Sequence, residues 1–185
     1  MKFSRPIPFP AALTRVLESA ARESVTPASW RDRLDDLHRE HRTWSATAEA
    51  LGVDDRTLER WRYGYQPKRR ADGTRPARQQ VDPATFVPKI RAALAASRRY
   101  QVNLVDWKRL KMHGAIEFYP DQPPKWQTIN LGPNISQLSL QGIVQAYLAA
   151  DADLMQTAVD VALSVDYLPY GTTVRLVEVD ELGFG

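Results

Sequence analysis

The hydrophobic positions near the start of the chain recur at helical spacing in two series. The first series consists of Leu13, Val16, Leu17 and Ala20, and the second of Trp30, Leu34, Leu37 and His41. Residues three or four apart share one face of a helix, so each series predicts an amphipathic helix. Thr26-Pro27 is typical of a helix start, because proline is favoured in the first turn, and this second helix is expected to end near Arg42.

Two shorter helical segments follow at residues 44–64. Ser45 is expected to cap the first of them, and Asp54 or Asp55 the second, because short polar side chains accept hydrogen bonds from the free N–H groups of a first turn. Between them, Gly52 can adopt the left-handed backbone that a tight turn requires. The pattern therefore predicts two short helices joined by a tight turn.

The residue types in this segment match the requirements of a helix-turn-helix. That motif needs a small residue where its helices cross closely, a glycine at the turn, and apolar residues afterwards that hold the helices at a steep angle. These types occur in the order Ala48, Gly52, Val53 and Leu58. The recognition helix of this motif is expected to cover residues 54–63. The alternative is a helical hairpin that only packs against its neighbours.

Residues 65–81 are rich in proline, glycine, lysine and arginine and show no apolar periodicity. Such a composition predicts a basic linker or an extended arm. Asp82-Pro83 then begins a further helix, in which Ile90 and Leu94 share one side.

The second half of the chain changes to short segments rich in β-forming residues. Three strands are predicted at QVNLVDW (101–107), GAIEFY (114–119) and WQTINLG (126–132), the first two as a hairpin. From Leu138 the helical spacing returns, as one bent helix or two. In a final strand at residues 172–181 the alternation changes phase midway, which a β-bulge or burial on both faces would explain.

Together these elements predict an α+β fold. The expected architecture is a helical N-terminal half with a helix-turn-helix, followed by a small β-sheet packed with C-terminal helices. The expected domains are a helical region at residues 1–64, a basic linker at residues 65–81 and an α+β domain at residues 82–185.

The charge is distributed unevenly along the chain. Residues 1–55 carry 8 basic and 9 acidic side chains, residues 56–111 carry 15 and 4, and residues 112–185 carry 2 and 9. The overall net charge of +3 therefore hides a middle block of +11 between blocks of −1 and −7. A basic block that includes a predicted recognition helix favours contact with a polyanion. The acidic block is expected to face a protein partner or a second copy of the chain.

The sequence excludes several classes of protein. Among its 185 residues there is no cysteine, so disulfide scaffolds and thiolate metal sites are absent. No apolar run approaches the ~20 residues of a membrane span and no secretory signal is seen at the start, so we expect a cytoplasmic, nucleoid-associated protein without a membrane partner. His38 and His41 lack a third metal ligand. The chain has no phosphate loop, dinucleotide motif or nucleophile elbow, so we expect no cofactor and no autonomous enzyme activity.

Polar residues of the predicted motif and of the basic segment are the candidate DNA contacts. Arginine can read guanine edges with two hydrogen bonds, and threonine can contact a base methyl group or a phosphate. The candidates in the motif are Ser45, Asp55, Arg56, Thr57, Arg60 and Arg62. The candidates in the basic segment are Lys68, Arg69, Arg70, Arg75 and Arg78, which could follow phosphates or enter a minor groove. The alternative for this second set is a solvated linker.

The five tryptophans divide into two groups. Trp30, Trp44 and Trp61 lie in or beside predicted helices and are expected to pack in the core. Trp107 and Trp126 lie in predicted strands beside basic residues, where sheet packing and stacking on unpaired bases are both open.

The order of these features resembles the telomere terminal proteins of actinobacterial linear chromosomes and plasmids, the Streptomyces type. The resemblance covers roughly residues 28–185 in order and size, and includes KWQTINLGPN (125–134) and the acidic VRLVEVDELGFG (174–185). It implies a protein that binds telomeric DNA and becomes covalently joined to the 5′ end. The implied partners are a DNA polymerase, which uses a side-chain hydroxyl as its primer, and a telomere-associated protein, which recruits the chain to a single-stranded overhang.

The resemblance places the linking hydroxyl in the middle of the chain, after the first strands and before the C-terminal helices. The hydroxyls in this stretch are Tyr119, beside a turn, and Thr128, in a predicted strand. Tyr119 has the more exposed position, whereas Thr128 keeps the residue type of the family, and both remain candidates. The alternative function is that of a transcriptional regulator or phage repressor whose C-terminal half forms a homodimer.

Overall fold

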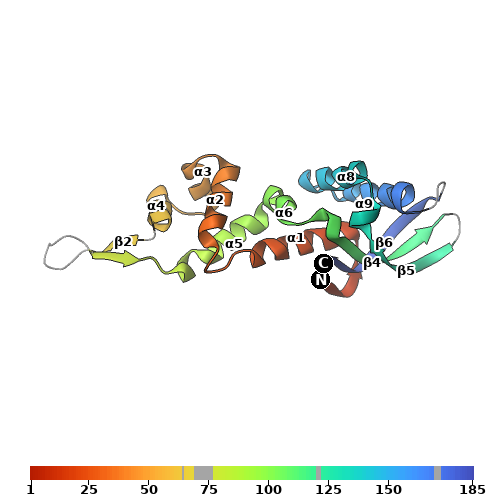
Figure 1. The fold of residues 1–185 in the computed structure, drawn as a ribbon, viewed down its shortest axis with the longest axis horizontal. Coiled ribbons are helices and arrows are strands. Elements are labelled where there is room, and N and C mark those ends of the chain that lie inside the picture. Colours follow the sequence, from red (N-terminus) through yellow and green to blue (C-terminus); the bar gives the residue numbers. More distant parts are fainter. Residues whose placement is uncertain (64, 69–76, 120–121, 169–171) are drawn as a thin grey trace. The chain divides into compact units, whose positions relative to one another are not determined.

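The computed structural model describes residues 1–63, 65–68, 77–119, 122–168 and 172–185 (Figure 1). The chain divides into two compact units. We call residues Met1–Ala20 together with Gln101–Gly185 the sheet unit, and residues Ala21–Tyr100 the helical unit. The predicted α+β class is confirmed, with helices in the N-terminal half and then a sheet with C-terminal helices.

The helical unit contains the predicted helix-turn-helix. Its elements are α2 (Trp30–His41), α3 (Trp44–Ala50), α4 (Asp55–Tyr63), β2 (Tyr65–Lys68), β3 (Ala77–Gln80), the turn η1 (Pro83–Thr85) and α5 (Val87–Ala96). An aromatic cluster fills its core: the ring centre of Phe86 lies 4.4 Å from that of Trp30 and 5.2 Å from that of Trp61. Both tryptophans are buried, which confirms that they pack in the core.

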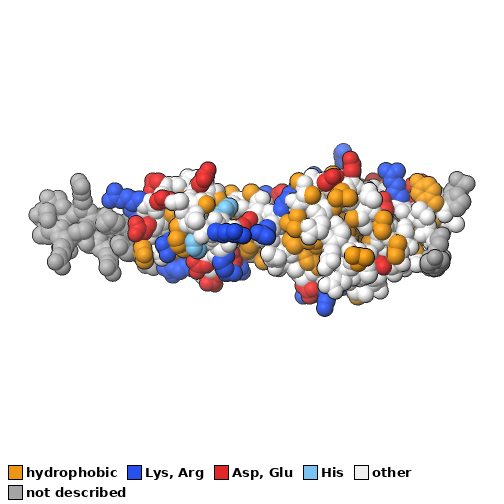
Figure 2. All heavy atoms as spheres, turned by 90° about the horizontal axis from the view of Figure 1, so that it is seen from above, with side chains coloured by type: hydrophobic (Ala, Val, Ile, Leu, Met, Phe, Trp, Pro, Cys, Tyr) orange, Lys and Arg blue, Asp and Glu red, His pale blue; other side chains and the backbone are white. Residues whose placement is uncertain are grey.

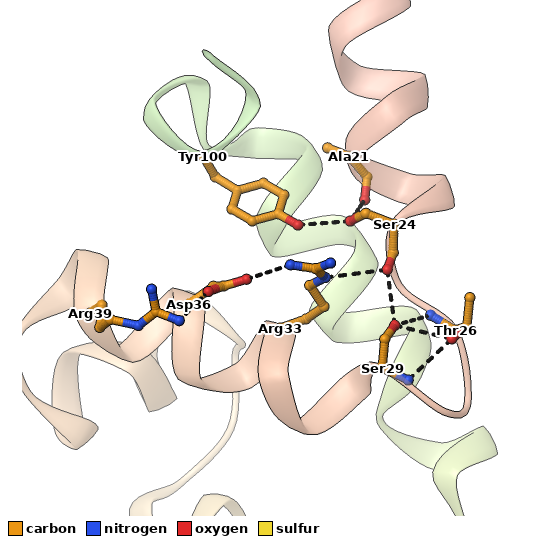
Figure 3. Close-up of polar contacts among 8 residues, drawn as sticks. All are labelled: Ala21, Ser24, Thr26, Ser29, Arg33, Asp36, Arg39 and Tyr100. Atoms are coloured by element: carbon orange, nitrogen blue, oxygen red, sulfur yellow. Dashed lines mark hydrogen bonds and ion pairs between the residues drawn. The ribbon is translucent and has the colours of Figure 1, made fainter. Parts of the chain in front are cut away.

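Polar contacts hold the start of α2 in place, as Figure 3 shows. The Ser29 hydroxyl accepts a hydrogen bond from the Thr26 backbone N–H at 2.9 Å, and Ser24 Oγ lies 2.8 Å from the Tyr100 hydroxyl. Arg33 reaches the Ser24 carbonyl at 3.3 Å and the Asp36 carboxylate at 2.8 Å, and this carboxylate raises the pKa of Arg33. Thr26 therefore belongs to a hydrogen-bonded turn, and α2 begins later than predicted, at Trp30.

The sheet unit is built on four antiparallel strands in the order β1-β6-β4-β5. These strands are β1 (Lys2–Ile7), β4 (Leu110–Phe118), β5 (Gln122–Asn130) and β6 (Val174–Phe184). The helices α1 (Phe9–Glu23) and α6 (Arg98–Leu104) each begin in one unit and end in the other. The remaining elements of the sheet unit are η2 (Trp107–Arg109), α7 (Leu131–Asn134), α8 (Gln137–Leu148), α9 (Ala152–Ala162) and the π-type turn η3 (Leu163–Tyr167). Residues 138–163 thus form two helices with a break, one of the two predicted outcomes.

The core of the sheet unit lies between the strands and the helices. Buried side chains of α1, α8 and α9, among them Leu13, Tyr147 and Val159, pack with Met112 of β4 and Leu176 of β6. The register between β4 and β6 shifts twice, between His113 and Gly114 and between Ala115 and Ile116. These bulges explain the change of phase in the final strand, because Leu176 and Val179 both reach the core.

The units do not follow the domain boundaries expected from the sequence, at residues 64 and 82. The first 20 residues lie with the C-terminal sheet, since β1 pairs with β6 and the α1 side chains Phe9, Leu13 and Leu17 are fully buried in its core. Conversely, α5 belongs to the helical unit. The segment expected to be a linker pairs with itself, as β2 and β3 form an antiparallel ribbon.

The prediction of a strand at residues 101–107 is wrong. This stretch forms the end of α6 and the start of η2, and the hairpin is formed by β4 and β5 instead. Val102 and Val105 pack against the core, and the Trp107 indole N–H donates to the Val102 carbonyl at 2.9 Å. Asp106 caps the start of η2, because its side chain accepts a hydrogen bond from the backbone N–H of Lys108. The two valines therefore reach the core from α6 and from the bend that follows it, and not from a strand.

Asp160 joins α9 to β6 and provides a test of the packing. Its Oδ1 accepts from the Leu176 N–H at 2.7 Å and from the Gln156 amide at 3.0 Å, and burial raises its pKa. Because the folded-state pKa lies above the unfolded value of ~3.9, this group stabilises the fold fully only below that pH, and the contribution is lost as pH rises through the folded pKa.

Replacing Asp160 by asparagine keeps the acceptor Oδ1 and removes the desolvated charge. The free energy of unfolding of Asp160→Asn relative to the wild type is therefore expected to increase as pH rises from about 4 through the folded pKa. Urea unfolding at a series of pH values measures this difference. A difference that stays constant between pH 4 and pH 7 would contradict the proposed desolvation.

Candidate nucleic-acid interface

Helix α3 and the turn after it are fixed by local hydrogen bonds. The Thr43 side chain accepts from the Ala46 backbone N–H at 3.2 Å, so Thr43 rather than the predicted Ser45 caps the helix. After the helix, the Val53 N–H donates to the Ala48 carbonyl at 3.0 Å across Gly52, whose φ is +62°. Glycine adopts this left-handed backbone without steric cost, which allows the chain to turn sharply into the next helix.

Helix α4 is capped by Asp54, one of the two predicted caps. Its carboxylate accepts from the Thr57 backbone N–H at 2.6 Å, and hydrogen bonds from Thr57 lower the pKa of Asp54. The inward side chains Leu58 and Trp61 are buried, as is Ala48 on α3. Lys89 of α5 reaches the Gly52 carbonyl at 3.1 Å and supports the turn. The two helices are therefore held by a shared core and by a braced turn.

The candidate contacts on the motif lie at its surface. Asp55, Arg56 and Arg62 of α4 and Ser45 of α3 are exposed, whereas Thr57 and Arg60 are half-buried. The Ser45 hydroxyl donates to the Asp55 carboxylate at 2.9 Å. This bond links the starts of α3 and α4, so Asp55 has a partner within the motif.

A stack of three side chains lies beside the motif and was not expected from the sequence. The Trp44 ring lies parallel to the His38 ring, with centres 3.8 Å apart and an interplanar angle of 4°. The Arg62 guanidinium lies 3.7 Å from the Trp44 ring centre. Trp44 is only half-buried, so the expectation that it packs in the core is met in part. The contacts connect α2, α3 and α4. His38 and Trp44 are six residues apart, and this spacing matches no known sequence motif, so the stack could not be predicted from the sequence.

The start of α3 and the outer side of α4 line one cleft. Its lining includes Trp44, Ser45, Asp55, Arg56, Glu59 and Arg62. Two arginines and a hydroxyl are groups that bind phosphate oxygens or base edges. Glu59 was not among the predicted contacts, and its carboxylate is expected to disfavour nonspecific approach of phosphates and so to restrict the position of α4.

The predicted basic contacts beyond α4 lie only partly within the described structure. Lys68 is in β2, and Arg78 is in β3 opposite Pro67. Arg69, Arg70 and Arg75 lie outside the described residues. The ribbon of β2 and β3 directly follows α4, and β2 contacts α4 through the backbone.

The two candidate linking hydroxyls are both in the sheet unit. Tyr119 follows β4, is 53% exposed, and donates its backbone N–H to the Thr173 carbonyl at 3.0 Å. Thr128 is exposed in β5, directly opposite His113 of β4. Trp107 packs edge-on against Phe184, with ring centres 5.3 Å apart, whereas Trp126 is 43% exposed and stacks on His113.

The described residues contain no cluster of histidine, cysteine, aspartate or glutamate that could hold a metal ion. Among the helices in the described part of the chain, none is long and apolar enough to cross a membrane.

Comparisons with protein-family models, curated protein sequences and solved structures found no match to this chain.

Proposed function

We propose that the chain is a DNA-binding terminal protein of a linear replicon. The observation that carries the DNA-binding part is the α3–α4 motif, whose recognition helix presents Arg56 and Arg62 beside Ser45 in one cleft. A helix-turn-helix places such a helix in the major groove, where its N-terminal residues reach base edges. The basic segment that begins directly after α4 supplies further positive charge for the phosphate backbone.

The terminal-protein part rests on the resemblance in the order of sequence features and on the exposed hydroxyls of the sheet unit. A protein primer needs a hydroxyl that can enter a polymerase active site in place of the 3′-OH of a nucleic acid. The exposure of Tyr119 and Thr128 meets this requirement. The polymerase would supply the metal ions and the in-line geometry of phosphoryl transfer.

The C-terminal helices support a protein partner for the sheet unit. Figure 2 shows hydrophobic side chains gathered over this unit, and the exposed ones on α8, α9 and η3 are Leu138, Leu148, Leu154, Val161 and Val165. Exposed apolar side chains grouped in this way are typical of interaction surfaces. Together with the acidic charge of residues 112–185, they suit a polymerase or a telomere-associated protein better than DNA.

A labelling reaction tests the priming role. The purified chain is incubated with an extract of its host cell as the polymerase source, labelled deoxynucleoside triphosphates and DNA carrying the host's replicon ends. The expected product is labelled protein that resists boiling in detergent. Absence of label, where a known terminal protein becomes labelled, would contradict the proposal. A footprint on an internal duplex with two-fold symmetry would instead support a dimeric transcriptional regulator.

Neutralising the basic segment tests the division between base reading and backbone binding. The variant in which Lys68, Arg69 and Arg70 are replaced by glutamine is expected to bind all duplexes more weakly. In a plot of log affinity against log salt concentration, the slope of the variant should be less negative than that of the wild type, by roughly 0.9 for each phosphate that the variant no longer neutralises. Titrations of a preferred and an unrelated duplex at several salt concentrations measure this. A selective weakening on the preferred duplex would show that these residues read bases.

A further inference from the structure

Two arginines of the helical unit lie over tryptophan rings. The Arg62 guanidinium, in the last turn of α4, lies 3.7 Å from the centre of the Trp44 ring. The Arg31 guanidinium, in the first turn of α2, lies 4.6 Å from the centre of the Trp30 ring. A cation in this position is attracted by the electron-rich face of the ring. Arg31 was not among the DNA contacts expected from the sequence.

Both tryptophan rings are themselves held in place. Trp30 is buried, and its ring centre lies 4.4 Å from that of Phe86. The Trp44 ring is stacked on His38. A fixed ring restricts the rotamers of the arginine that packs on it, so less conformational entropy is lost when this arginine binds a ligand. The two guanidinium groups are therefore positioned before a ligand arrives.

The donors of both guanidinium groups are available to a ligand. Arg31 and Arg62 are exposed, and in the described part of the chain neither guanidinium forms a hydrogen bond or an ion pair. By contrast, Arg33 and Arg39 on α2 bind the Asp36 carboxylate, as Figure 3 shows. A guanidinium carries five N–H donors in a planar fork that matches the oxygens of a phosphate group.

One small cleft brings the two arginines together. It measures ≈ 190 Å³, and its lining includes Arg31, Arg62, Trp30, Leu34, Asp35 and Tyr63. Two of these side chains are positive and one is negative, so the small cleft favours an anion. Its volume is about six times the ~30 Å³ that one water molecule occupies in the liquid. A phosphate group therefore fits into it.

Arg62 connects the small cleft to the larger cleft between α3 and α4. The larger cleft is also lined by Arg62, together with Ser45 and Arg56 near the starts of the two helices. In a helix-turn-helix, the N-terminal residues of the recognition helix reach base edges. Most other protein–DNA hydrogen bonds go to phosphates and sugars, which set the register of the protein on the duplex. The small cleft lies at the opposite end of α4 from the base-reading residues.

We propose that Arg31 and Arg62 bind the sugar–phosphate backbone of the DNA strand that borders the groove, and that Trp30 and Trp44 position them. This inference rests on the proposed DNA binding, and it is independent of the priming role. It adds Arg31 of α2 to the interface, outside the α3–α4 motif. Contacts of this kind fix the depth and the register of α4 in the groove and carry no sequence information.

The variants Arg31→Gln and Arg39→Gln test the backbone contact. Each removes one positive charge from the exposed surface of α2, but Arg39 lines neither cleft. For Arg31→Gln, Kd at 0.1 M salt should rise about eightfold, because one phosphate contact contributes a slope of roughly 0.9 in log affinity against log salt. The rise should be equal for the preferred and an unrelated duplex. Arg39→Gln should change Kd much less. Fluorescence anisotropy at several salt concentrations measures both.

Phosphate ethylation interference locates the contact on the duplex. Ethylation of a phosphate beside the enriched bases should block binding of the wild type and of Arg39→Gln. At that phosphate, ethylation should no longer affect Arg31→Gln. An identical interference pattern for the wild type and Arg31→Gln would show that Arg31 does not touch the backbone.

A double-mutant cycle tests the positioning role of Trp44. If Trp44 acts through Arg62, Trp44→Leu should make the salt slope less negative in the wild type and leave it unchanged in Arg62→Gln. Trp44→Phe, which keeps an aromatic face, should retain the wild-type slope. A measurement that needs no variant is ¹⁵N relaxation of the unbound wild type, in which the Arg62 Nε–H should be more restricted than the Arg56 Nε–H. Equal mobility of the two groups would show that Trp44 does not hold Arg62.

The outcomes separate the inference from the proposed function. If the wild type selects a motif and Arg31→Gln has the wild-type salt slope, the backbone contact is wrong and DNA binding by α4 stands. If Arg31→Gln weakens binding to the preferred duplex alone, Arg31 reads bases and the backbone contact is wrong as well. If the wild type binds no duplex, the proposed DNA binding fails and this inference with it.

Discussion

Replacing Arg56 by alanine is expected to weaken binding to the preferred duplex by ~1–3 kcal/mol, which corresponds to an increase in Kd of about fivefold to 150-fold. Arg56 is exposed near the start of α4 and lines the cleft with Ser45. Without the guanidinium, the bidentate hydrogen bonds to a guanine edge cannot form, so the discrimination against a duplex altered at that position should disappear too. Fluorescence anisotropy with the duplex most enriched from a random pool measures both effects.

Arg99→Ala is the matched control for this substitution. Arg99 is exposed in the helical unit and is outside the α3–α4 motif, so the variant loses the same charge from the same unit. Its affinity for the preferred duplex should fall by much less than that of Arg56→Ala, and by the same factor for every sequence. Equal losses of affinity for the two variants, without change in sequence preference, would show that Arg56 only adds positive charge.

Replacing Trp61 by alanine is expected to lower the free energy of unfolding of the helical unit by ~3–5 kcal/mol. Trp61 is buried and lies beside Phe86, which also contacts Trp30, so truncation leaves a cavity in the core beneath α4. Since domains are typically stable by only ~5–15 kcal/mol, the decrease should be visible as a large shift in the urea midpoint. Far-UV circular dichroism follows the transition without relying on tryptophan fluorescence.

Tyr63→Ala supplies the comparison for Trp61. Tyr63 lies two residues further on the same helix and is 58% exposed, so its removal leaves no cavity. An exposed substitution of this kind usually changes stability by less than ~0.5 kcal/mol. Similar midpoints for both variants would mean that α4 is not anchored through the aromatic cluster.

The helix-turn-helix could be predicted because its determinants are local. Ala48, Gly52 and Leu58 have the required chemistry at fixed spacing along the chain, and the left-handed turn at Gly52 and the buried Leu58 agree with it. The caps were harder to predict. Thr43 and Ser45 both have a suitable hydroxyl. Which of them caps α3 depends on the residue at which the helix begins, and α3 begins at Trp44, directly after Thr43. Ser45 instead bonds Asp55 across the motif.

The features that could not be predicted depend on contacts between distant residues. β1 is a mostly exposed strand without a clear alternation of apolar residues, and it forms because β6 provides a pairing edge far along the chain. The stack of His38, Trp44 and Arg62 requires three helices to come together. The proximity of Asp180, His113 and Thr128 likewise depends on the order of the strands in the sheet and on a β-bulge. Neither of these can be predicted from the spacing of residues along the chain.

The central claim is that α4 of the helix-turn-helix reads the sequence of duplex DNA. The most direct measurement is a binding selection from a random duplex pool, carried out in parallel with the wild type and the variant in which Arg56 and Arg60 are both alanine. We expect the wild type to enrich a defined motif and the variant to enrich none while retaining salt-dependent binding. Enrichment of the same motif by both proteins, or of no motif by the wild type, would contradict the claim.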